Sequence, residues 1–229
     1  MKIIKLLVGI VLIPFCIAVT QTLVSLVRVM QPSDCSAIPS SAWALGGGFL
    51  VWLFLYFVLP RPVRTYVLAH ELTHALWGLL MDAKIFRMRI SAKSGSVTLS
   101  KTNFIILLAP YFFPLYTVLV IAGYYVLSVF FDMERYYLCW LSLIGFTWGF
   151  HFTFTISTLL QHQTDVKECG RVFSYAMIYL MNIFGICLWI VIVSSVTLEQ
   201  MVSFTGEHIG SLSVFLLEKT ALIFDKIRQ

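Results

Sequence analysis

Charged residues are scarce in this chain of 229 residues. They make up 12% of it, whereas hydrophobic residues make up 59% and the mean hydropathy is +0.90. A soluble domain is about a quarter charged, so the composition predicts an integral membrane protein with about six spans and no large extramembrane domain. The net charge of +5 lies in short loops, and no basic run alternates with aromatic residues, which excludes a nucleic-acid surface. No nucleotide-binding module is visible.

Cysteine and histidine are also few. The five cysteines form no CxxC pair, which excludes a disulfide framework and a cysteine zinc site, and we expect them to be small apolar residues of helices. Five histidines are too few for a membrane di-iron hydroxylase or desaturase. The chain has no GxSG motif, so it lacks the signature of a serine intramembrane protease.

The long apolar runs predict an all-α polytopic membrane protein that forms one domain, residues 1–229. The first run is expected to be an uncleaved span, with a signal peptide as the alternative reading, because it lacks a clean cleavage site. A loosely amphipathic C-terminal helix, about 208–228, is expected at the membrane interface. The predicted transmembrane or membrane-embedded helices are about 3–27, 43–60, 65–81, 104–130, 136–160 and 171–196.

The third of these helices carries the sequence HELTH, residues 70–74. Residues four apart lie on nearly the same face of a helix, so His70 and His74 can offer two imidazoles to one metal ion. Glu71 lies beside that face, where it can deprotonate a metal-bound water. Ionisable residues are costly in an apolar, membrane-embedded helix and indicate a functional site. The motif therefore predicts one Zn²⁺ per chain, with Glu71 as the catalytic residue.

A small β-hairpin is predicted after the HELTH helix, over about residues 84–101. Apolar and polar residues alternate on both sides of a Lys-Ser-Gly turn, which is typical of two paired strands. The hairpin is either a solvated basic connector or an exposed strand edge near the active site. In the second case Val97 and Leu99 pair with an extended substrate peptide.

The orientation of the chain depends on whether the HELTH helix crosses the membrane. If all six helices cross, Lys and Arg divide equally between the two sides; if the HELTH helix is re-entrant, the N-terminus is expected in the cytoplasm. Both arrangements allow a cytoplasmic hairpin. So short a polytopic chain suits a bacterial plasma membrane.

A catalytic zinc usually takes a third protein ligand from elsewhere in the chain. On a straight helix His151 would lie about 20 Å from Asp165, so these two cannot share a metal there, and His151 is expected to hydrogen-bond between helices. Asp165, with His162 in reserve, is the better group. The candidates are His151, His162, Asp165, Glu168 and His208.

These features together resemble the site-2 protease family of intramembrane zinc metalloproteases. The resemblance covers roughly Leu68 to Val193 and rests on HELTH, the basic hairpin, the Pro-containing span LLAPYFFPLY and a late Asp before a final span. It implies an endopeptidase that cleaves membrane-anchored proteins within or near their transmembrane segments. It also implies His70, His74 and Asp165 as zinc ligands. A Gln-Thr-Asp-Val sequence replaces the family's Asn-Pro-x-x-Asp-Gly context, and no PDZ-like insert is present.

Two other functions are compatible with the motif. A membrane zincin of the CAAX-processing type takes a Glu as its third ligand, and Glu168 is the one late carboxylate that could serve. A catalytically inactive, metalloprotease-like membrane scaffold would keep the zinc site without cleaving peptides. The intact Glu71 argues against the scaffold, because a structural zinc site needs no general base.

Overall fold

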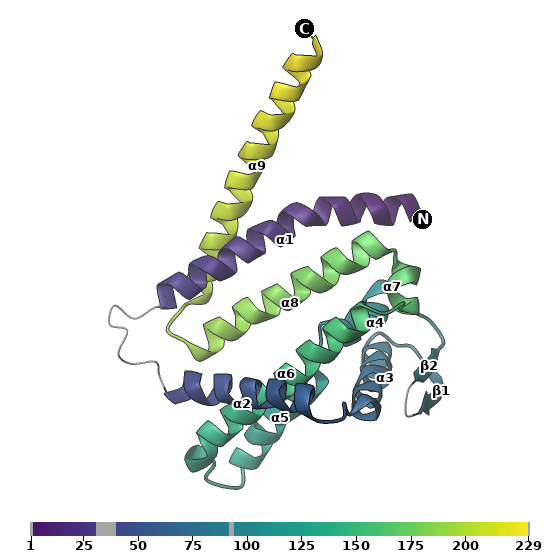
Figure 1. Ribbon diagram of the computed structural model, residues 1–229, viewed down its shortest axis with the longest axis vertical. Helices are drawn as coiled ribbons and strands as arrows, with labels where there is room; N and C mark the ends of the chain where they lie inside the picture. Colours follow the sequence, from purple (N-terminus) through teal and green to yellow (C-terminus); the bar gives the residue numbers. More distant parts are fainter. Residues whose placement is uncertain (1, 31–39, 92–93, 229) are drawn as a thin grey trace. The chain divides into compact units, whose positions relative to one another are not determined.

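The computed structural model of the chain describes residues 2–30, 40–91 and 94–228. It is mostly helical, with one two-stranded antiparallel sheet (Figure 1). The chain divides into two compact units, one made of Met1–Cys35 with Gly170–Gln229 and the other of Ser36–Cys169. The single domain expected from the sequence stays a prediction.

The first unit consists of α1 (Lys2–Met30), α8 (Arg171–Val193) and α9 (Leu198–Arg228). Helices α1 and α8 approach closely, because a Cβ at Gly9 would lie 2.7 Å from the backbone nitrogen of Phe173. Helix α9 begins earlier than the predicted residue 208. Thr197 and Gln200 hydrogen-bond to each other's backbone N–H at 3.2 and 2.9 Å, which is the capping box that starts a helix.

The second unit contains the remaining elements, and the most extensive helix–helix contact in it is between α2 and α6. Small residues allow this contact: a Cβ at Gly48 would meet the Ser142 carbonyl, and one at Gly145 the Leu45 carbonyl. Such close backbone approach is typical of helices packed in membranes. The elements are α2 (Ser40–Val58), α3 (Val63–Leu80), β1 (Ile85–Ile90), β2 (Gly95–Leu99), α4 (Phe104–Leu108), η1 (Ala109–Tyr111), α5 (Leu115–Ser128), η2 (Glu134–Tyr136), α6 (Tyr137–Leu159) and α7 (Thr164–Cys169).

An aromatic cluster joins α3 to α2 and α6. The Tyr66 ring stacks on Phe154 with centroids 4.8 Å apart and planes at 9°, and Trp52 donates a hydrogen bond to Thr153 at 2.9 Å. Trp52, Tyr56, Tyr66, Phe150 and Phe154 are all buried. The cluster therefore fixes the HELTH helix against the end of α6 that leads into α7.

The predicted hairpin is confirmed. Strands β1 and β2 pair antiparallel, with Met88 opposite Val97 and Ile90 opposite Gly95, and both strands pack against α3 (Figure 1). Lys93 of the predicted turn lies outside the described residues. A Cβ at Gly78 of α3 would lie 3.0 Å from the Leu99 side chain, so a glycine allows the strand to lie close to the helix.

The predicted continuous helix over 104–130 is wrong. The segments Phe104–Tyr111 and Leu115–Ser128 meet at an angle of 79°. Pro114 lacks an N–H and disfavours helical geometry in the residue before it, so the helix ends and restarts there. Helix α6 likewise ends at Leu159, and the short helix α7, which the sequence analysis did not predict, follows.

The described residues contain four helices that are long and apolar enough to cross a membrane, or five if the bent pair is one span. They support an integral membrane protein. The four are Ile3–Met30, Ser40–Val58, Glu134–Leu159 and Arg171–Ile192. Helix α3 is not among them, and its membrane-embedded position stays a prediction, as does the interfacial position of α9.

Candidate metal centre

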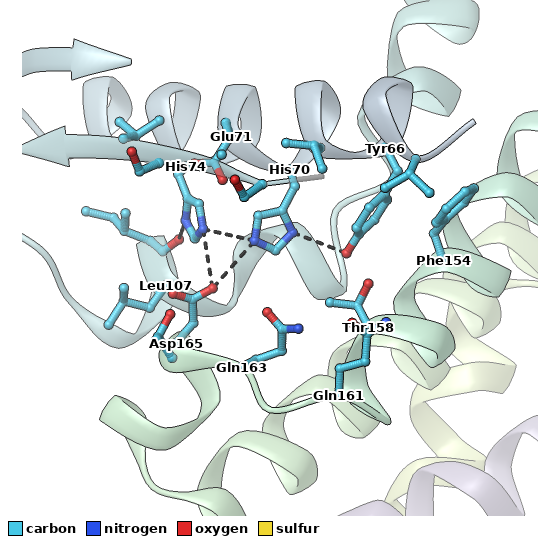
Figure 2. A pocket seen from close by; sticks show the side chains of 18 of the residues that line it. Tyr66, His70, Glu71, His74, Leu107, Phe154, Thr158, Gln161, Gln163 and Asp165 are labelled. Atoms are coloured by element: carbon cyan, nitrogen blue, oxygen red, sulfur yellow. Dashed lines mark hydrogen bonds and ion pairs between the residues drawn. The ribbon is translucent and has the colours of Figure 1, made fainter. Parts of the chain in front are cut away.

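The two histidines of HELTH project from the same face of α3. Their rings meet edge to face, with centroids 4.8 Å apart, and their Nε2 atoms lie 3.2 Å apart. Residues four apart on a helix are neighbours on its surface, which explains this geometry. The pair therefore presents two imidazole nitrogens to one point (Figure 2).

Asp165 meets this histidine pair from the other side. It lies at the start of α7, and its Oδ2 is 3.5 Å from the Nε2 atoms of both His70 and His74. Burial disfavours the carboxylate, but imidazoles that are protonated in the metal-free protein donate hydrogen bonds to it and add positive charge, which outweighs that cost and holds the pKa of Asp165 well below its usual range. Tyr111, fully buried, donates a hydrogen bond to the same oxygen at 3.0 Å.

His70, His74 and Asp165 form a group that could hold a metal ion. The three facing atoms are 3.2, 3.5 and 3.5 Å apart. Ligands at about 2.0–2.1 Å from a tetrahedral ion lie about 3.3–3.4 Å from one another. Two imidazole nitrogens and one carboxylate oxygen also match a zinc donor set that leaves a fourth position for water or substrate. Both the spacing and the chemistry of the group thus fit zinc.

The remaining ring nitrogen of each histidine has its own partner. His74 Nδ1 lies 2.8 Å from the Ile106 carbonyl, and His70 Nδ1 lies 3.2 Å from the Tyr66 hydroxyl. Outer partners of this kind orient metal-binding histidines and fix which nitrogen carries the proton. Tyr66 also belongs to the aromatic cluster. The packing of α3 on α6 therefore helps to position His70.

A cavity of ≈ 630 Å³ opens beside the group (Figure 2). Glu71 is buried and lines it together with the two histidines. Strand β2 borders it at Gly95, where a Cβ would lie 2.6 Å from Glu71 Oε1. A larger residue at position 95 would displace the Glu71 side chain from this position, so the hairpin and the HELTH helix fit together at the expected catalytic residue.

The cavity lining is rich in hydroxyl and amide groups. Gln161 and Gln163 face it from the segment between α6 and α7, and Thr158 lies at the end of α6 (Figure 2). Val97 and Leu99, the residues predicted to pair with substrate, line it from β2. The cavity can therefore offer hydrogen bonds to an extended peptide on two sides.

The other third-ligand candidates lie outside the group of three among the described residues. His162 is exposed, and Glu168 lines the cavity without joining the group. His208 lies in the other unit, 3.0 Å from Ser25 Oγ. His151 is buried, but its Nε2 has no hydrogen-bond partner in the described part of the chain. The interhelical hydrogen bond expected for His151 is therefore not formed at Nε2.

Sequence reasoning missed three partners of the metal centre. Tyr66 precedes His70 by one helical turn, a spacing that could have indicated it. Tyr111 and the Ile106 carbonyl come from the Pro-containing segment, and no local pattern connects them with HELTH. No protein-family model, curated protein or solved structure matches this chain.

Proposed function

We propose that the protein is a zinc-dependent intramembrane endopeptidase, similar to the site-2 protease family. The observation that carries this proposal is the triangle of His70, His74 and Asp165, with spacings suited to a tetrahedral ion, beside the buried carboxylate of Glu71. A structural zinc site would fill its fourth position with another protein ligand and would need no such carboxylate.

Bound zinc would supply Lewis acidity and lower the pKa of a water towards about 7. His70, His74 and Asp165 would hold the ion. Glu71 takes the proton from the attacking water and returns it to the leaving amine, which is the role of a general base and acid. Gly95 keeps the Glu71 side chain at the cavity wall by leaving space for it.

The proposed substrate is a membrane-anchored protein whose transmembrane segment unwinds locally. A helix hides its peptide bonds in its own hydrogen bonds, and lipid offers no partner to amides that are freed. Strand β2 supplies such partners, because it borders the cavity at Gly95, Val97 and Leu99.

The hydrogen-bond pattern of the hairpin supports this use of β2. Ser91 N–H donates to the Ser94 carbonyl at 2.9 Å, so these two residues form a bonded pair beside the turn. Bonded and non-bonded pairs alternate along an antiparallel ladder. Met88 and Val97 are then a non-bonded pair, which directs the Val97 amide away from β1 and towards the free edge. An extended peptide can pair with that edge.

The metal content of the purified protein tests the proposal. We expect one zinc per chain in the wild type and a large loss in His70→Ala and Asp165→Ala. His162→Ala and Glu168→Ala are matched controls from the same segment and should keep the metal. Zinc lost from Glu168→Ala but kept by Asp165→Ala would favour a CAAX-type site. Zinc bound by a wild type that cleaves no membrane protein would favour an inactive scaffold.

A further inference from the structure

The backbone around Ile106 differs from an ordinary helix because of a proline. In an α-helix the carbonyl of residue 106 accepts a hydrogen bond from the N–H of residue 110. Residue 110 is proline, which has no N–H. The next N–H before it, that of Ala109, donates to the Ile105 carbonyl. The Ile106 carbonyl is therefore left without its helical donor.

A metal-site histidine takes the place of that donor. His74 Nδ1 lies 2.8 Å from the Ile106 oxygen. Ile106 is 1% exposed and His74 8% exposed, so water does not compete for this carbonyl. A buried carbonyl without a partner is costly, and the histidine removes that cost.

The backbone N–H of Ile106 is also held, on the other side of the Ile106 Cα from the carbonyl. The Asn103 side chain caps α4 and accepts a hydrogen bond from the Ile106 N–H at 2.9 Å. The Asn103 cap therefore helps to fix the position of Ile106, and the missing Pro110 N–H leaves the Ile106 carbonyl available to His74.

We propose that Pro110 is a positioning residue for the metal centre, because it reserves the Ile106 carbonyl for His74. A carbonyl only accepts hydrogen bonds, so neutral His74 must carry its proton on Nδ1. Its Nε2 then has a free lone pair on the side of His70 and Asp165, 3.2 and 3.5 Å away. This inference rests on the proposed zinc site and not on peptide hydrolysis.

The test compares Pro110→Ala with Pro114→Ala in the full-length protein in detergent. Both substitutions remove a proline from the same bend, but only Pro110→Ala returns a donor to Ile106. Competition with a chromogenic chelator gives the zinc affinity. ¹⁵N NMR of the zinc-free, ¹⁵N-histidine-labelled protein, at a pH where His74 is neutral, gives its tautomer, and His74→Ala assigns the signal.

We expect Pro110→Ala to bind zinc about 10- to 100-fold more weakly and to lose the uniform Nδ1–H form of His74. Pro114→Ala should match the wild type in both. Equal losses in the two variants, or unchanged zinc affinity in Pro110→Ala, would overturn the inference. Protonation of neutral His74 on Nε2 in the wild type would also overturn it. That measurement does not depend on the folding of any variant. A wild type that binds no zinc but keeps the Nδ1–H form would instead contradict the proposed function.

Discussion

Gln163 and Gln161 are neighbouring amides on the cavity wall with different surroundings. Gln161 Nε2 donates to the Ser157 carbonyl of its own helix at 3.0 Å. Among the described residues, the Gln163 side chain makes no hydrogen bond, and it points into the cavity beside Asp165 (Figure 2). In the proposed reaction, Gln163 would donate to the peptide carbonyl oxygen as negative charge develops there.

We predict that Gln163→Met weakens the binding of a tetrahedral analogue, whereas Gln161→Met does not. The probe is a blocked Gly-Gly phosphinic pseudodipeptide, measured by calorimetry on the zinc-loaded protein. Loss of a hydrogen bond to a charged oxygen is worth about 1.5–3 kcal/mol, or about 10- to 100-fold in affinity. Equal affinities of Gln163→Met and the wild type would show that this amide does not contact the oxyanion.

The sequence was informative about single residues where helix periodicity applies. HELTH identifies His70, Glu71 and His74 because their spacing alone places them on or beside one face of a helix. Asp165 is favoured within a short list of candidate third ligands and is also implied by the family resemblance, but no periodicity identifies it, since it lies 91 positions after His74. Tyr111 could not be predicted, because its contact with Asp165 joins two segments 54 residues apart and no local pattern connects them.

At the scale of elements, the hairpin is the part whose role is easiest to isolate. Val97→Pro removes an N–H that points to the free edge of β2 and is not used in the β1–β2 ladder, so the hairpin should persist. We expect kcat/KM for a membrane-anchored substrate to fall about 2- to 10-fold, which corresponds to one strand hydrogen bond. Leu99→Pro should act similarly, and the zinc content should not change.

Val97→Ala and Leu99→Ala are the matched controls, because they shorten the side chain and keep the N–H. If the proline variants lose activity and the alanine variants do not, the loss comes from the missing strand N–H and not from a lost side-chain contact. Normal cleavage by both proline variants would show that the hairpin is a connector and that substrate is captured elsewhere in the cavity.

Elements with a clear periodic or apolar sequence pattern were predictable. Elements that depend on a proline or on only a few residues were not. The hairpin and α6 follow the alternation and the apolar run of the sequence. The 79° break between Phe104–Tyr111 and Leu115–Ser128 was overlooked because the apolar run continues through its prolines. Helix α7 was overlooked because it has only 6 residues, too few to show a periodic pattern.

At the scale of the whole molecule, the orientation in the membrane is open to a direct test. The basic residues Lys84, Arg87, Arg89 and Lys101 flank or lie in the hairpin, and positive charge favours the cytoplasmic side. In a chain whose native cysteines are replaced by alanine, we expect Ser96→Cys to react with a membrane-impermeant maleimide only after the cells are permeabilised.

Asp132→Cys serves as the matched probe, because it is exposed in the turn after α5. Labelling of Asp132→Cys in intact cells would indicate that the bent pair crosses the membrane, whereas protection would indicate a re-entrant pair. Labelling of Ser96→Cys in intact cells would contradict a cytoplasmic hairpin.

The proposed peptidase activity depends on Glu71, and the variant Glu71→Gln isolates that dependence. The substitution keeps the shape of the side chain and leaves all three metal ligands, but removes the general base. Protein N-termini are compared in membranes from cells that produce the wild type or Glu71→Gln, and zinc is measured in both purified proteins. We expect one zinc per chain in each protein, and new N-termini within or near transmembrane segments with the wild type alone. The same new N-termini in cells that produce Glu71→Gln would show that Glu71 is not the general base.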